Sequence, residues 1–536
     1  MNVSLFERST GNIGPNAFAR LQTTQLLHNF RPAPRFRFDG GERIAFDDAD
    51  QDDLVSTSEP SVSLWAHQAG INALALERFD GRILISGGSD GTIRLWDLER
   101  CENPTTAYTY RPVAEIPRAA PPEARPLSRS RLRGQTQVPH HVNTTQIQPL
   151  TSAGHRFGIT HLSFYPFDSA AFMSSSYDQT LKLWATEEAR LSGTFPLGAK
   201  VYTHALSPVA SHLLVACGTQ HPAVRLVDLR SGAAVQSLVA PGTVGGAAGA
   251  VLAVAWSPRH EHVLASGTLD GAVRIWDVRR ASGMVALLDQ EDSVGIAETA
   301  ESTNGGRGVS AGGNGSNTGY GALRERGIRT SAKAHAGPVN SLAWTDDGAY
   351  IVSAGLDRRI RVWDAATGAN TLANFGPTVR NSQLATVTMF TSSVGLTPPK
   401  QELLFWPNET EIVVFDLHRG TTITRLRGLG PNLAAVRARR GGERTVRNRI
   451  TSLVWRGAGG GGGSSGVVMG GTNAAGGIYS GHLDGQIRAW LPQLEGGDDE
   501  ELDPSSAQVE DEDRSRKRKA IDDVYKSLMG RKVTFI

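Results

Sequence analysis

The sequence predicts an all-β protein built from seven similar repeats. Five segments share one pattern, in which an apolar strand leads into a turn with Asp and then into an alternating strand that ends in Trp. In each of the five, Ser lies ten residues and Asp six residues before the Trp. Two weaker copies carry Val227 and Phe415 at the Trp position. The seven copies are 85–97, 173–185, 216–228, 265–277, 352–364, 404–416 and 479–491.

The composition excludes several classes of protein. A formal net charge of +2 in 536 residues is not the strong basic excess of a protein that wraps nucleic acid. The two cysteines, Cys101 and Cys217, cannot form a disulfide framework or a Cys-based zinc site, and they favour a reducing, intracellular compartment. No run approaches the roughly 18 apolar residues of a membrane span. Residues 1–10 also lack the pattern of a secretory signal.

Three of the repeats are preceded by a His, at His67, His155 and His335. This pattern of residues resembles that of the WD-repeat family, whose repeat begins near Gly-His and ends near Trp-Asp. The resemblance covers about residues 62–492 and implies a seven-bladed WD-repeat β-propeller of four-stranded blades. Closing such a ring needs a strand from one terminus, and we expect the segment 61–65 to supply the outer strand of the blade that ends at Trp490.

The chain divides into three parts on this interpretation. Residues 1–59 form an N-terminal helical segment and linker, residues 60–492 the propeller, and residues 493–536 an acidic, then basic, mostly disordered tail. Four segments inside the propeller lack apolar periodicity and are rich in Gly, Pro, Ser, Thr or Arg, so we expect flexible insertions there. They are 101–150, 290–333, 437–449 and 457–476.

Three repeats contain the side-chain types of a hydrolytic triad. A nucleophile would occur once and be exposed, whereas these groups recur in register. We therefore expect buried hydrogen-bonded networks that end on the Trp indole N–H. No phosphate-binding loop or metal motif is present, so the sequence predicts no enzyme, no cofactor and no metal site. The three networks are His67, Ser86, Asp90 and Trp96; His155, Ser174, Asp178 and Trp184; and His335, Ser353, Asp357 and Trp363.

The N-terminus contains a candidate helix over residues 17–30, which follows Asn16 as a plausible cap. Its apolar residues occupy more than one face, with Phe18 and Leu21 on one side and Leu26, Leu27 and Phe30 spread over another. A helix of this kind needs partners on more than one side. Two interpretations remain open: the helix binds in a groove of another protein, or it packs under the protein's own ring.

An Arg follows one Trp-Asp pair, in the sequence Trp276-Asp277-Val278-Arg279. This resembles the motif with which WD-repeat proteins dock on the large subunit of the damaged-DNA-binding complex, the adaptor of a cullin-4 ubiquitin ligase. The planar fork of Arg suits such an interface because it can make two hydrogen bonds. Asp228 and Arg230 form a degenerate copy. The alternative for either Arg is a rim residue paired with a nearby carboxylate.

Further segments, LFERSTG at 5–11, WDVRRASG at 276–283 and NTLANFG at 370–376, are similar to the Cockayne syndrome group A protein family. That resemblance implies a non-catalytic substrate receptor of a cullin-4 RING ubiquitin ligase in transcription-coupled nucleotide excision repair. The implied partners are the adaptor, which the helix residues of the N-terminal segment 1–59 and one face of the ring would bind, the cullin-4 ligase, the group B remodelling ATPase and RNA polymerase. The alternative is a general WD-repeat scaffold in chromatin or RNA processing.

The tail contains a basic cluster that reads as a nuclear localisation signal and predicts a nuclear protein. A solvated tail is the alternative. The basic clusters of the chain lie in predicted loops and tails without interleaved aromatic residues, which argues against direct DNA contact. The residues of the cluster are Arg514, Arg516, Lys517, Arg518 and Lys519.

Overall fold

The fold comes from a computed structural model of the chain. The residues that it describes are 2–41, 65–101, 106–119, 153–239, 249–280, 283–294, 332–428, 433–437, 443–457 and 476–493.

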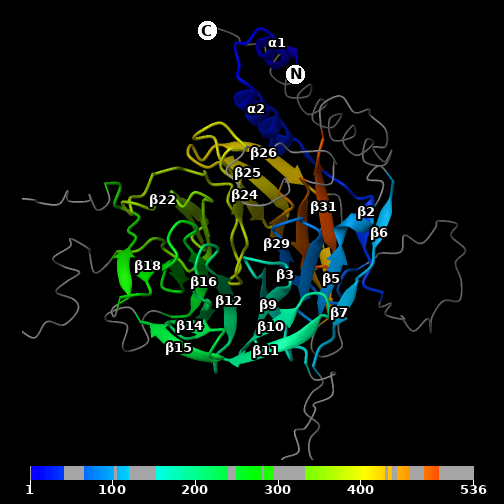
Figure 1. Cartoon of the computed structure of the whole chain (residues 1–536), viewed down its shortest axis with the longest axis vertical. Coiled ribbons are helices and arrows are strands. Elements are labelled where there is room, and N and C mark those ends of the chain that lie inside the picture. Colours follow the sequence, from blue (N-terminus) through cyan, green and yellow to red (C-terminus); the bar gives the residue numbers. More distant parts are fainter. Residues whose placement is uncertain are drawn as a thin grey trace, which may run out of the picture. The chain divides into compact units, whose positions relative to one another are not determined.

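Seven antiparallel sheets form a closed ring within the described residues, which confirms the predicted seven-bladed β-propeller (Figure 1). Each blade runs from an inner strand at the axis to an outer strand at the rim, and neighbouring inner strands contact one another all the way round. Blades one to three are β3 (Ile71–Leu76), β4 (Ile83–Gly88), β5 (Ile93–Asp97) and β7 (Ala114–Ile116); β8 (Ile159–Phe164), β9 (Ala171–Ser176), β10 (Thr180–Ala185) and β11 (Arg190–Pro196); and β12 (Val201–Leu206), β13 (Leu214–Thr219), β14 (Val224–Asp228) and β15 (Ala233–Leu238).

The remaining blades follow in the same order. Blade five has three strands in the part of the chain that the structure describes, and an isolated bridge from Trp363 to Asn370 extends it. Blades four to seven are β16 (Val251–Trp256), β17 (Val263–Thr268), β18 (Val273–Asp277) and β19 (Met284–Leu287); β20 (Val339–Trp344), β21 (Tyr350–Gly355) and β22 (Arg359–Asp364); β23 (Phe390–Thr391), β24 (Leu403–Asn408), β25 (Glu411–Asp416) and β26 (Thr422–Arg427); and β29 (Ile450–Trp455), β30 (Ile478–His482), β31 (Ile487–Pro492) and β1 (Phe30–Pro32).

The tight turn with Asp predicted in each strong repeat joins the second and third strands of its blade. Gly91 follows Asp90 in blade one with φ of 88°, and its N–H donates to the carbonyl of Gly88 at 3.2 Å. Glycine reaches this left-handed region at no steric cost. Gln179 occupies the same place in blade two with φ of 71°, a conformation that a residue with a side chain rarely adopts.

The core lies between neighbouring blades, where the apolar faces of their strands meet. Ile85 and Leu95 of blade one, for example, share a buried cluster with Leu162, Phe172 and Trp184 of blade two. Because each blade buries one face against the blade before it and the other against the blade after it, a repeat gains its full core only within the ring.

The ring closes differently from the expectation for segment 61–65. The outer strand of blade seven is β1, in which Phe30 pairs with Pro492 and Pro32 pairs with Trp490. Phe30 is 2% exposed and meets Phe405 of blade six edge to face, with ring centroids 6.0 Å apart. The N-terminus therefore still completes the last blade, but with a strand about thirty residues earlier in the chain, because Phe30 can fill the core at that edge.

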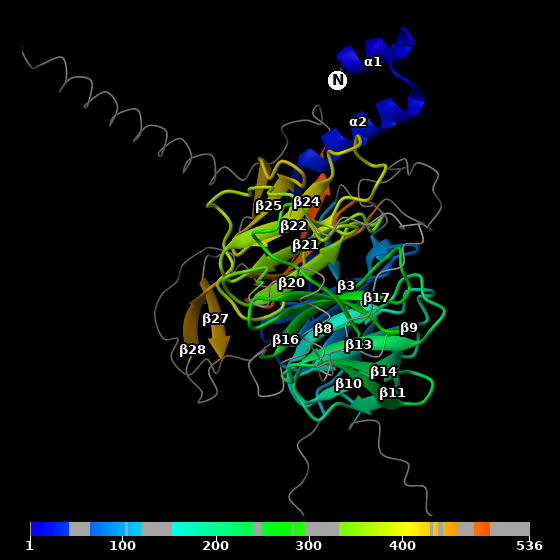
Figure 2. The same ribbon diagram turned by 90° about the vertical axis from the view of Figure 1, so that its left-hand side faces the viewer.

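Two helices precede β1, α1 (Asn2–Ser9) and α2 (Pro15–His28). Figures 1 and 2 show α2 at one edge of the ring beside β26 and β31, with α1 farther from the blades. The predicted helix over 17–30 is thus shifted by two residues: Gly14 is the N-cap, Pro15 begins the helix, and Phe30 belongs to a strand. Pro suits the first turn of a helix because its missing N–H has no partner there in any case.

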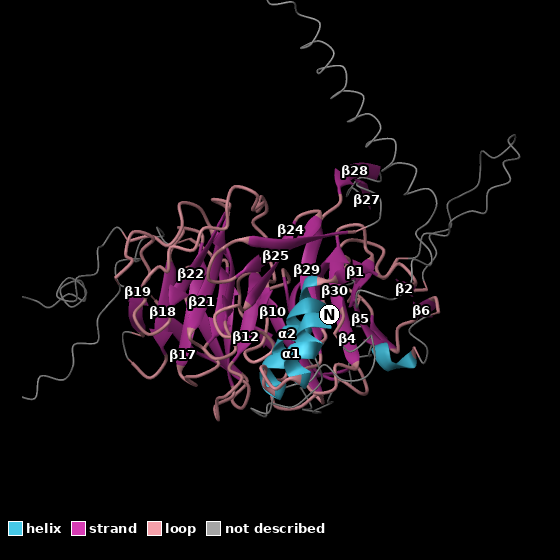
Figure 3. Ribbon diagram, turned by 90° about the horizontal axis from the view of Figure 1, so that it is seen from above, coloured by secondary structure: helices cyan, strands magenta, loops and turns pink. Residues whose placement is uncertain are grey.

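Two of the predicted flexible insertions contain strands. Within 101–150, β6 (Tyr108–Tyr110) pairs in parallel with β2 (Phe36–Phe38), and β7 completes blade one. Around 437–449, β27 (Leu433–Arg437) and β28 (Glu443–Arg447) form a hairpin that projects from the blades in Figures 2 and 3. A short 3-10 helix, η1 (Leu98–Arg100), follows β5. Residues 120–150 and 458–475 lie outside the described residues, as does the tail from residue 494 with its basic cluster 514–519.

Candidate functional site

The His, Ser, Asp and Trp of blade two form a continuous hydrogen-bonded chain. Trp184 Nε1–H donates to Ser174 Oγ at 2.7 Å, and His155 Nε2 lies 2.7 Å from the same oxygen. The Ser hydroxyl therefore gives its one hydrogen to His155 Nε2, which leaves Nδ1–H of a neutral imidazole to donate to Asp178 at 2.8 Å. Ser174 and His155 are 0% exposed, so no substrate can reach the hydroxyl.

Blade five repeats this geometry. Trp363 Nε1–H donates to Ser353 Oγ at 2.8 Å, His335 Nε2 lies 2.8 Å from that oxygen, and His335 Nδ1 lies 2.9 Å from Asp357 Oδ1. Arg361 also donates to Asp357, at 3.0 Å. The four residues named from the sequence are brought together here as in blade two.

Blade one inserts a threonine between the His and the Asp. Trp96 Nε1–H donates to Ser86 Oγ at 2.9 Å, and His67 Nε2 lies 2.7 Å from it. His67 Nδ1, however, lies 2.8 Å from Thr92 Oγ1, and the Thr92 hydroxyl donates to Asp90 Oδ1 at 2.7 Å. The nearest His67 to Asp90 distance is 3.7 Å, so the two interact mainly through Thr92.

The three carboxylates of these networks stay ionised in the folded protein. Burial on its own would raise their pKa values, but the hydrogen bonds that each carboxylate accepts from its neighbours outweigh it and lower the pKa of Asp90, Asp178 and Asp357 to about 2. Burial lowers the pKa of His155 and of His335, partly opposed by their Asp partners. These groups are held in one protonation state, which suits a structural role better than proton transfer.

Two further blades use the Trp and Ser offset without the preceding His. Trp276 Nε1–H donates to Ser266 Oγ at 2.7 Å, and Trp490 Nε1–H donates to Ser480 Oγ at 2.9 Å. In blade seven the imidazole comes from His482, whose Nε2 lies 2.9 Å from Ser480 Oγ. The shared offsets in the repeats could have identified both of these networks.

The two Asp-x-Arg pairs stand at the ends of the third strands of their blades, β18 and β14. The Arg279 guanidinium makes two hydrogen bonds to Asp277, from Nε at 3.1 Å and from Nη2 at 2.9 Å. The Arg279 side chain is 65% exposed. That geometry matches the alternative of a rim Arg paired with a nearby carboxylate. Arg230 is exposed, and Asp228 Oδ1 accepts its backbone N–H at 2.9 Å. Whether either Arg contacts a partner stays a prediction.

The helix residues named from the sequence separate into two groups. Leu27 is 0% exposed and, like Phe30, packs into the core between blades six and seven. Leu26 and Phe18 are half-buried, and Leu21 is 37% exposed. The end of α2 nearest the ring therefore packs on the protein itself, while its other end, with Val3 and Phe6 of α1 at 73% and 67% exposure, presents apolar surface.

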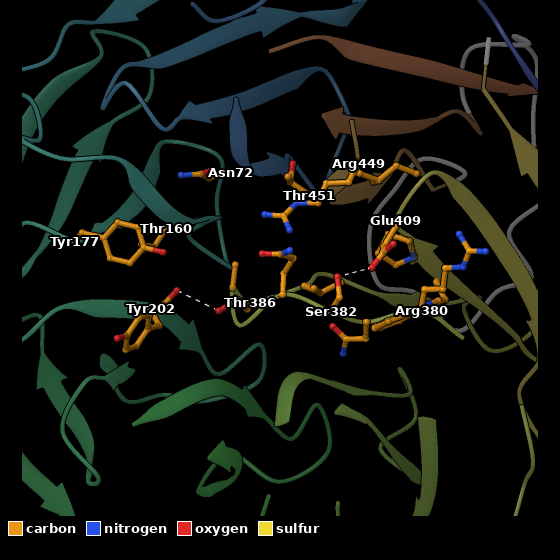
Figure 4. Close-up of a pocket in the computed structure, with 17 residues that line it drawn as sticks. Asn72, Thr160, Tyr177, Tyr202, Arg380, Ser382, Thr386, Glu409, Arg449 and Thr451 are labelled. Atoms are coloured by element: carbon orange, nitrogen blue, oxygen red, sulfur yellow. Dashed lines mark hydrogen bonds between the residues drawn. The ribbon is translucent and has the colours of Figure 1, made fainter. Parts of the chain in front are cut away.

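A pocket at the propeller axis was not predicted. It is an open hollow of about 690 Å³, solvent at its mouth included, and is lined from blades one, two, three, six and seven and by the segment 380–387, which connects blades five and six. Figure 4 shows Arg449, Glu409 and Arg380 on one side of the hollow and Tyr177 with Tyr202 on the other. Its lining residues are spread from Asn72 to Thr451, so no local motif marks it.

The connecting segment is fastened at several points. Asn340 Nδ2–H donates to the carbonyl of Gln383 at 2.9 Å, and Asn381 Nδ2–H donates to Asn340 Oδ1 at 2.8 Å. The Thr386 hydroxyl donates to the carbonyl of Leu252 at 2.9 Å. The segment 380–387 is therefore held in place by side-chain hydrogen bonds to blades four and five.

Two kinds of feature are absent from the described residues, a cluster of metal ligands and a membrane-spanning helix. No group of three or more His, Cys, Asp or Glu side chains there is placed to hold a metal ion. No described helix has the length and apolar character needed to cross a membrane.

Comparisons with known proteins agree on the repeat. The family model described as WD domain, G-beta repeat matches residues 58–97, 147–185, 241–277 and 328–364. The WD repeat-containing protein ATCSA-1 of Arabidopsis thaliana is 30% identical over 458 residues, which cover 79% of this chain and 87% of that protein. The ribosome biogenesis protein ytm1 of Aspergillus terreus is 28% identical over 314 residues, which cover 58% of this chain and 56% of that protein. That of Emericella nidulans is also 28% identical, over 306 residues. This chain spans about half the length of the ytm1 relatives.

These findings correct the prediction that the chain is a member of the Cockayne syndrome group A family. The relatives join a plant WD-repeat protein with several proteins named ribosome biogenesis protein ytm1, and so they do not single out that repair family. The predicted partners, which are the adaptor, the cullin-4 ligase, the group B remodelling ATPase and RNA polymerase, stay untested. The shared repeat and the 30% identity over most of a WD-repeat relative show that this chain belongs to the WD-repeat family.

Proposed function

We propose that the protein is a non-catalytic WD-repeat scaffold in RNA processing, acting in the nucleus during the assembly of ribosomes. The observation that carries the process is the similarity to several proteins named ribosome biogenesis protein ytm1. Because this chain covers about half of their length, their activity is transferred to it only as a proposal.

The blade networks support the non-catalytic part of the proposal. The groups that could have formed a hydrolytic triad form hydrogen bonds within their own blades, and the Ser hydroxyls of blades one, two and five are 0% exposed. A hydroxyl that donates to a His and accepts from a Trp inside a blade has no access to substrate. The rigid ring instead provides separate surfaces that can hold two partners at a fixed distance, which raises their effective concentration for each other.

The process is tested by sedimentation. We expect the tagged full chain, in nuclear extract of its own cells, to co-sediment on a sucrose gradient with particles that contain precursor ribosomal RNA. Depletion of the protein should lead to accumulation of that precursor. Sedimentation as a free protein, together with unchanged precursor levels on depletion, would contradict the proposal.

The N-terminal helices offer one contact surface for such a scaffold, because Val3, Phe6 and Leu21 are exposed. A deletion that reaches Phe30 would also remove β1 and open blade seven. The sharper variant is therefore Phe6→Ser with Leu21→Ser, which leaves the closing strand intact. We expect this variant to melt like the parent and to lose part of its association with the particles. Unchanged association would exclude the helices as a contact surface.

A further inference from the structure

The polar side chains that line the axial pocket fall into two sets, and the first set holds the inner strands together. Asn72 Nδ2–H donates to the carbonyl of Ile159 at 2.8 Å, Thr451 Oγ1–H donates to that of Ile71 at 2.6 Å, and Thr160 Oγ1 lies 3.0 Å from Ser175 Oγ. The first two bonds link blade one to blades two and seven around the axis, and the third joins two strands of blade two. The side chains that make them are engaged and serve the ring.

The second set consists of donors without an acceptor. Trp406 lines the pocket, its side chain is fully buried, and its Nε1–H has no acceptor among the described residues. An orphaned buried N–H costs about 1–3 kcal/mol, so it marks a place where an acceptor is expected. The Trp residues of blades one, two, four, five and seven, by contrast, donate to a Ser.

Arg449 is the second such donor. It lines the same pocket, is half-buried, and forms no ion pair within the part of the chain described. Burial lowers its pKa below the usual value, opposed by the charge of Glu409. The guanidinium stays charged all the same, because arginine remains protonated in proteins. In Figure 4 its side chain extends into the hollow.

The charges of the lining sum to one positive. Arg380, Arg449 and Glu409 are its three charged residues. The Glu409 carboxylate accepts the hydroxyl hydrogen of Ser382 at 2.6 Å. The backbone of Glu409 has a φ of 62°, a conformation that costs free energy for a residue with a side chain. The turn thereby places a carboxylate beside the two arginines without closing an ion pair with Arg449.

We propose that this pocket binds an extended segment of a partner protein through one carboxylate side chain, Asp or Glu. The carboxylate forms an ion pair with Arg449, and Tyr177 and Tyr202 lie on the opposite side of the bound segment. The unused donors call for an oxygen acceptor, and one net positive charge matches one carboxylate. The tyrosine rings meet edge to face with centroids 6.1 Å apart, and they offer apolar area with hydroxyl tips to the neighbouring peptide.

The same observations disfavour RNA as the occupant. A polynucleotide carries a charge at every phosphate and is bound by rows of Lys and Arg that follow its backbone. The lining holds two cations and one carboxylate, so a second phosphate would meet Glu409. The proposal rests on the scaffold function above, since it names the chemistry of a partner of that scaffold.

The test uses the full chain and an array of random decapeptides graded from no acidic residue to four. We expect bound peptides to be enriched in Asp or Glu at one position. In solution, replacing that residue with Gln or Asn should weaken binding at least tenfold by fluorescence polarisation. Binding that is no better for acidic than for neutral peptides would overturn the proposal. So would tighter binding of a single-stranded RNA decamer, or of the phosphoserine version of the same peptide by more than tenfold.

Two variants locate the site. Arg449→Gln should weaken binding of the selected peptide at least tenfold, and Trp406→Phe should weaken it severalfold by removing the indole N–H. Arg449→Gln should leave the melting temperature nearly unchanged, because the guanidinium has no ion pair to lose among the described residues. Trp406→Phe also leaves a cavity in the core, so its binding is measured well below its melting temperature. The matched control is Arg190→Gln on the outer strand of blade two, where Arg190 is 70% exposed; it should bind as the parent does. Equal loss in the control would place the interaction elsewhere.

Failure of this proposal is distinguishable from failure of the proposed function. If Arg449→Gln loses the peptide while the parent chain never co-sediments with precursor particles, the pocket stands and the process is wrong. If the parent co-sediments but binds acidic and neutral peptides equally, the scaffold stands and the pocket assignment is wrong.

Discussion

The blade networks and the axial pocket treat buried polar groups in opposite ways. In blade two, the hydrogen-bonding atoms of His155, Ser174 and Trp184 side chains all have partners within the blade. In the pocket, Trp406 Nε1–H is just as buried and has no acceptor among the described residues. Both regions are built from polar side chains on strands of the same propeller.

The difference separates stability from binding. A buried polar group that is satisfied internally adds to stability and cannot also bind a ligand, whereas one left unsatisfied destabilises the free protein and is compensated when an acceptor arrives. Recurrence points the same way, because the networks repeat around the ring while the pocket occurs once. Mutations in the blade networks should therefore lower the free energy of unfolding more than mutations of the pocket donors. Mutations of the pocket donors should instead weaken ligand binding.

The largest effect is expected for Ser174→Ala. Removing this hydroxyl leaves Trp184 Nε1–H and His155 Nε2 without their partner inside the core. Two orphaned groups at about 1–3 kcal/mol each should reduce the free energy of unfolding by about 3 kcal/mol. Urea denaturation measures it. Ser382→Ala, at the exposed rim of the pocket, is the matched control and should cost less than about 0.5 kcal/mol. Equal losses of unfolding free energy in the two variants would contradict the proposed difference between the blade networks and the pocket.

Acid should weaken the networks through their carboxylates. The pKa of Asp178 is about 2 in the folded protein against 3.8 for an unperturbed carboxyl, so the unfolded chain binds the proton more tightly. Its contribution is complete above about pH 4 and is lost as the pH falls toward 2, amounting to about 2 kcal/mol. Asp178→Asn should flatten the fall in stability between pH 4 and pH 2, measured by urea denaturation at each pH.

The control for the acid experiment is Asp168→Asn, an exposed residue of the same blade. It should leave the parent's pH profile unchanged. The slope in Asp178→Asn should shrink without vanishing, because Asp90 and Asp357 still titrate in their own networks. An unchanged slope in Asp178→Asn would mean that its bond to His155 contributes nothing.

The two regions can be compared directly by replacing one buried tryptophan in each. Trp184→Phe and Trp406→Phe remove the same atoms from sites that are 1% and 0% exposed, so their cavity costs should be similar. Trp184→Phe also breaks a bond to Ser174, whereas Trp406→Phe removes an unsatisfied N–H. We expect Trp184→Phe to be more destabilising by about 1–2 kcal/mol. If Trp406→Phe is the worse of the two, the indole N–H has a partner after all.

The smallest effect concerns the strained turns. Gln179, in a blade, and Glu409, in the pocket, both have positive φ. Gln179→Gly should raise the free energy of unfolding by about 0.5–1 kcal/mol, because relief of left-handed strain exceeds the entropy cost of Gly, and it should leave peptide binding unchanged. The reciprocal Gly91→Gln should destabilise, since its Cβ would also lie 3.0 Å from the carbonyl of Phe157.

Much of the fold could be predicted because its signals are local. The Trp and Ser offset predicted the hydrogen bond in three blades and also fits the two blades, four and seven, in which no network was predicted, and the Asp turn located their hairpins. The closing strand could not be predicted in this way. β1 has three residues, too few to show a period of two, and its place is set by the fit of Phe30 against blade six. Helix α1 was missed because it lies farther from the blades than α2 (Figure 1) and leaves apolar residues such as Val3 and Phe6 exposed, so no core-facing apolar stripe marks it.

The sequence by itself determined the seven repeats, their turns and the residue types that fill each blade, because strand period and turn chemistry act over about ten residues. The tertiary structure alone decided which donors remain unused. Whether Trp406 or Arg449 meets an acceptor depends on how the strands of several blades and the segment 380–387 converge on the axis. A donor becomes a binding group only when assembly of the ring buries it without a partner.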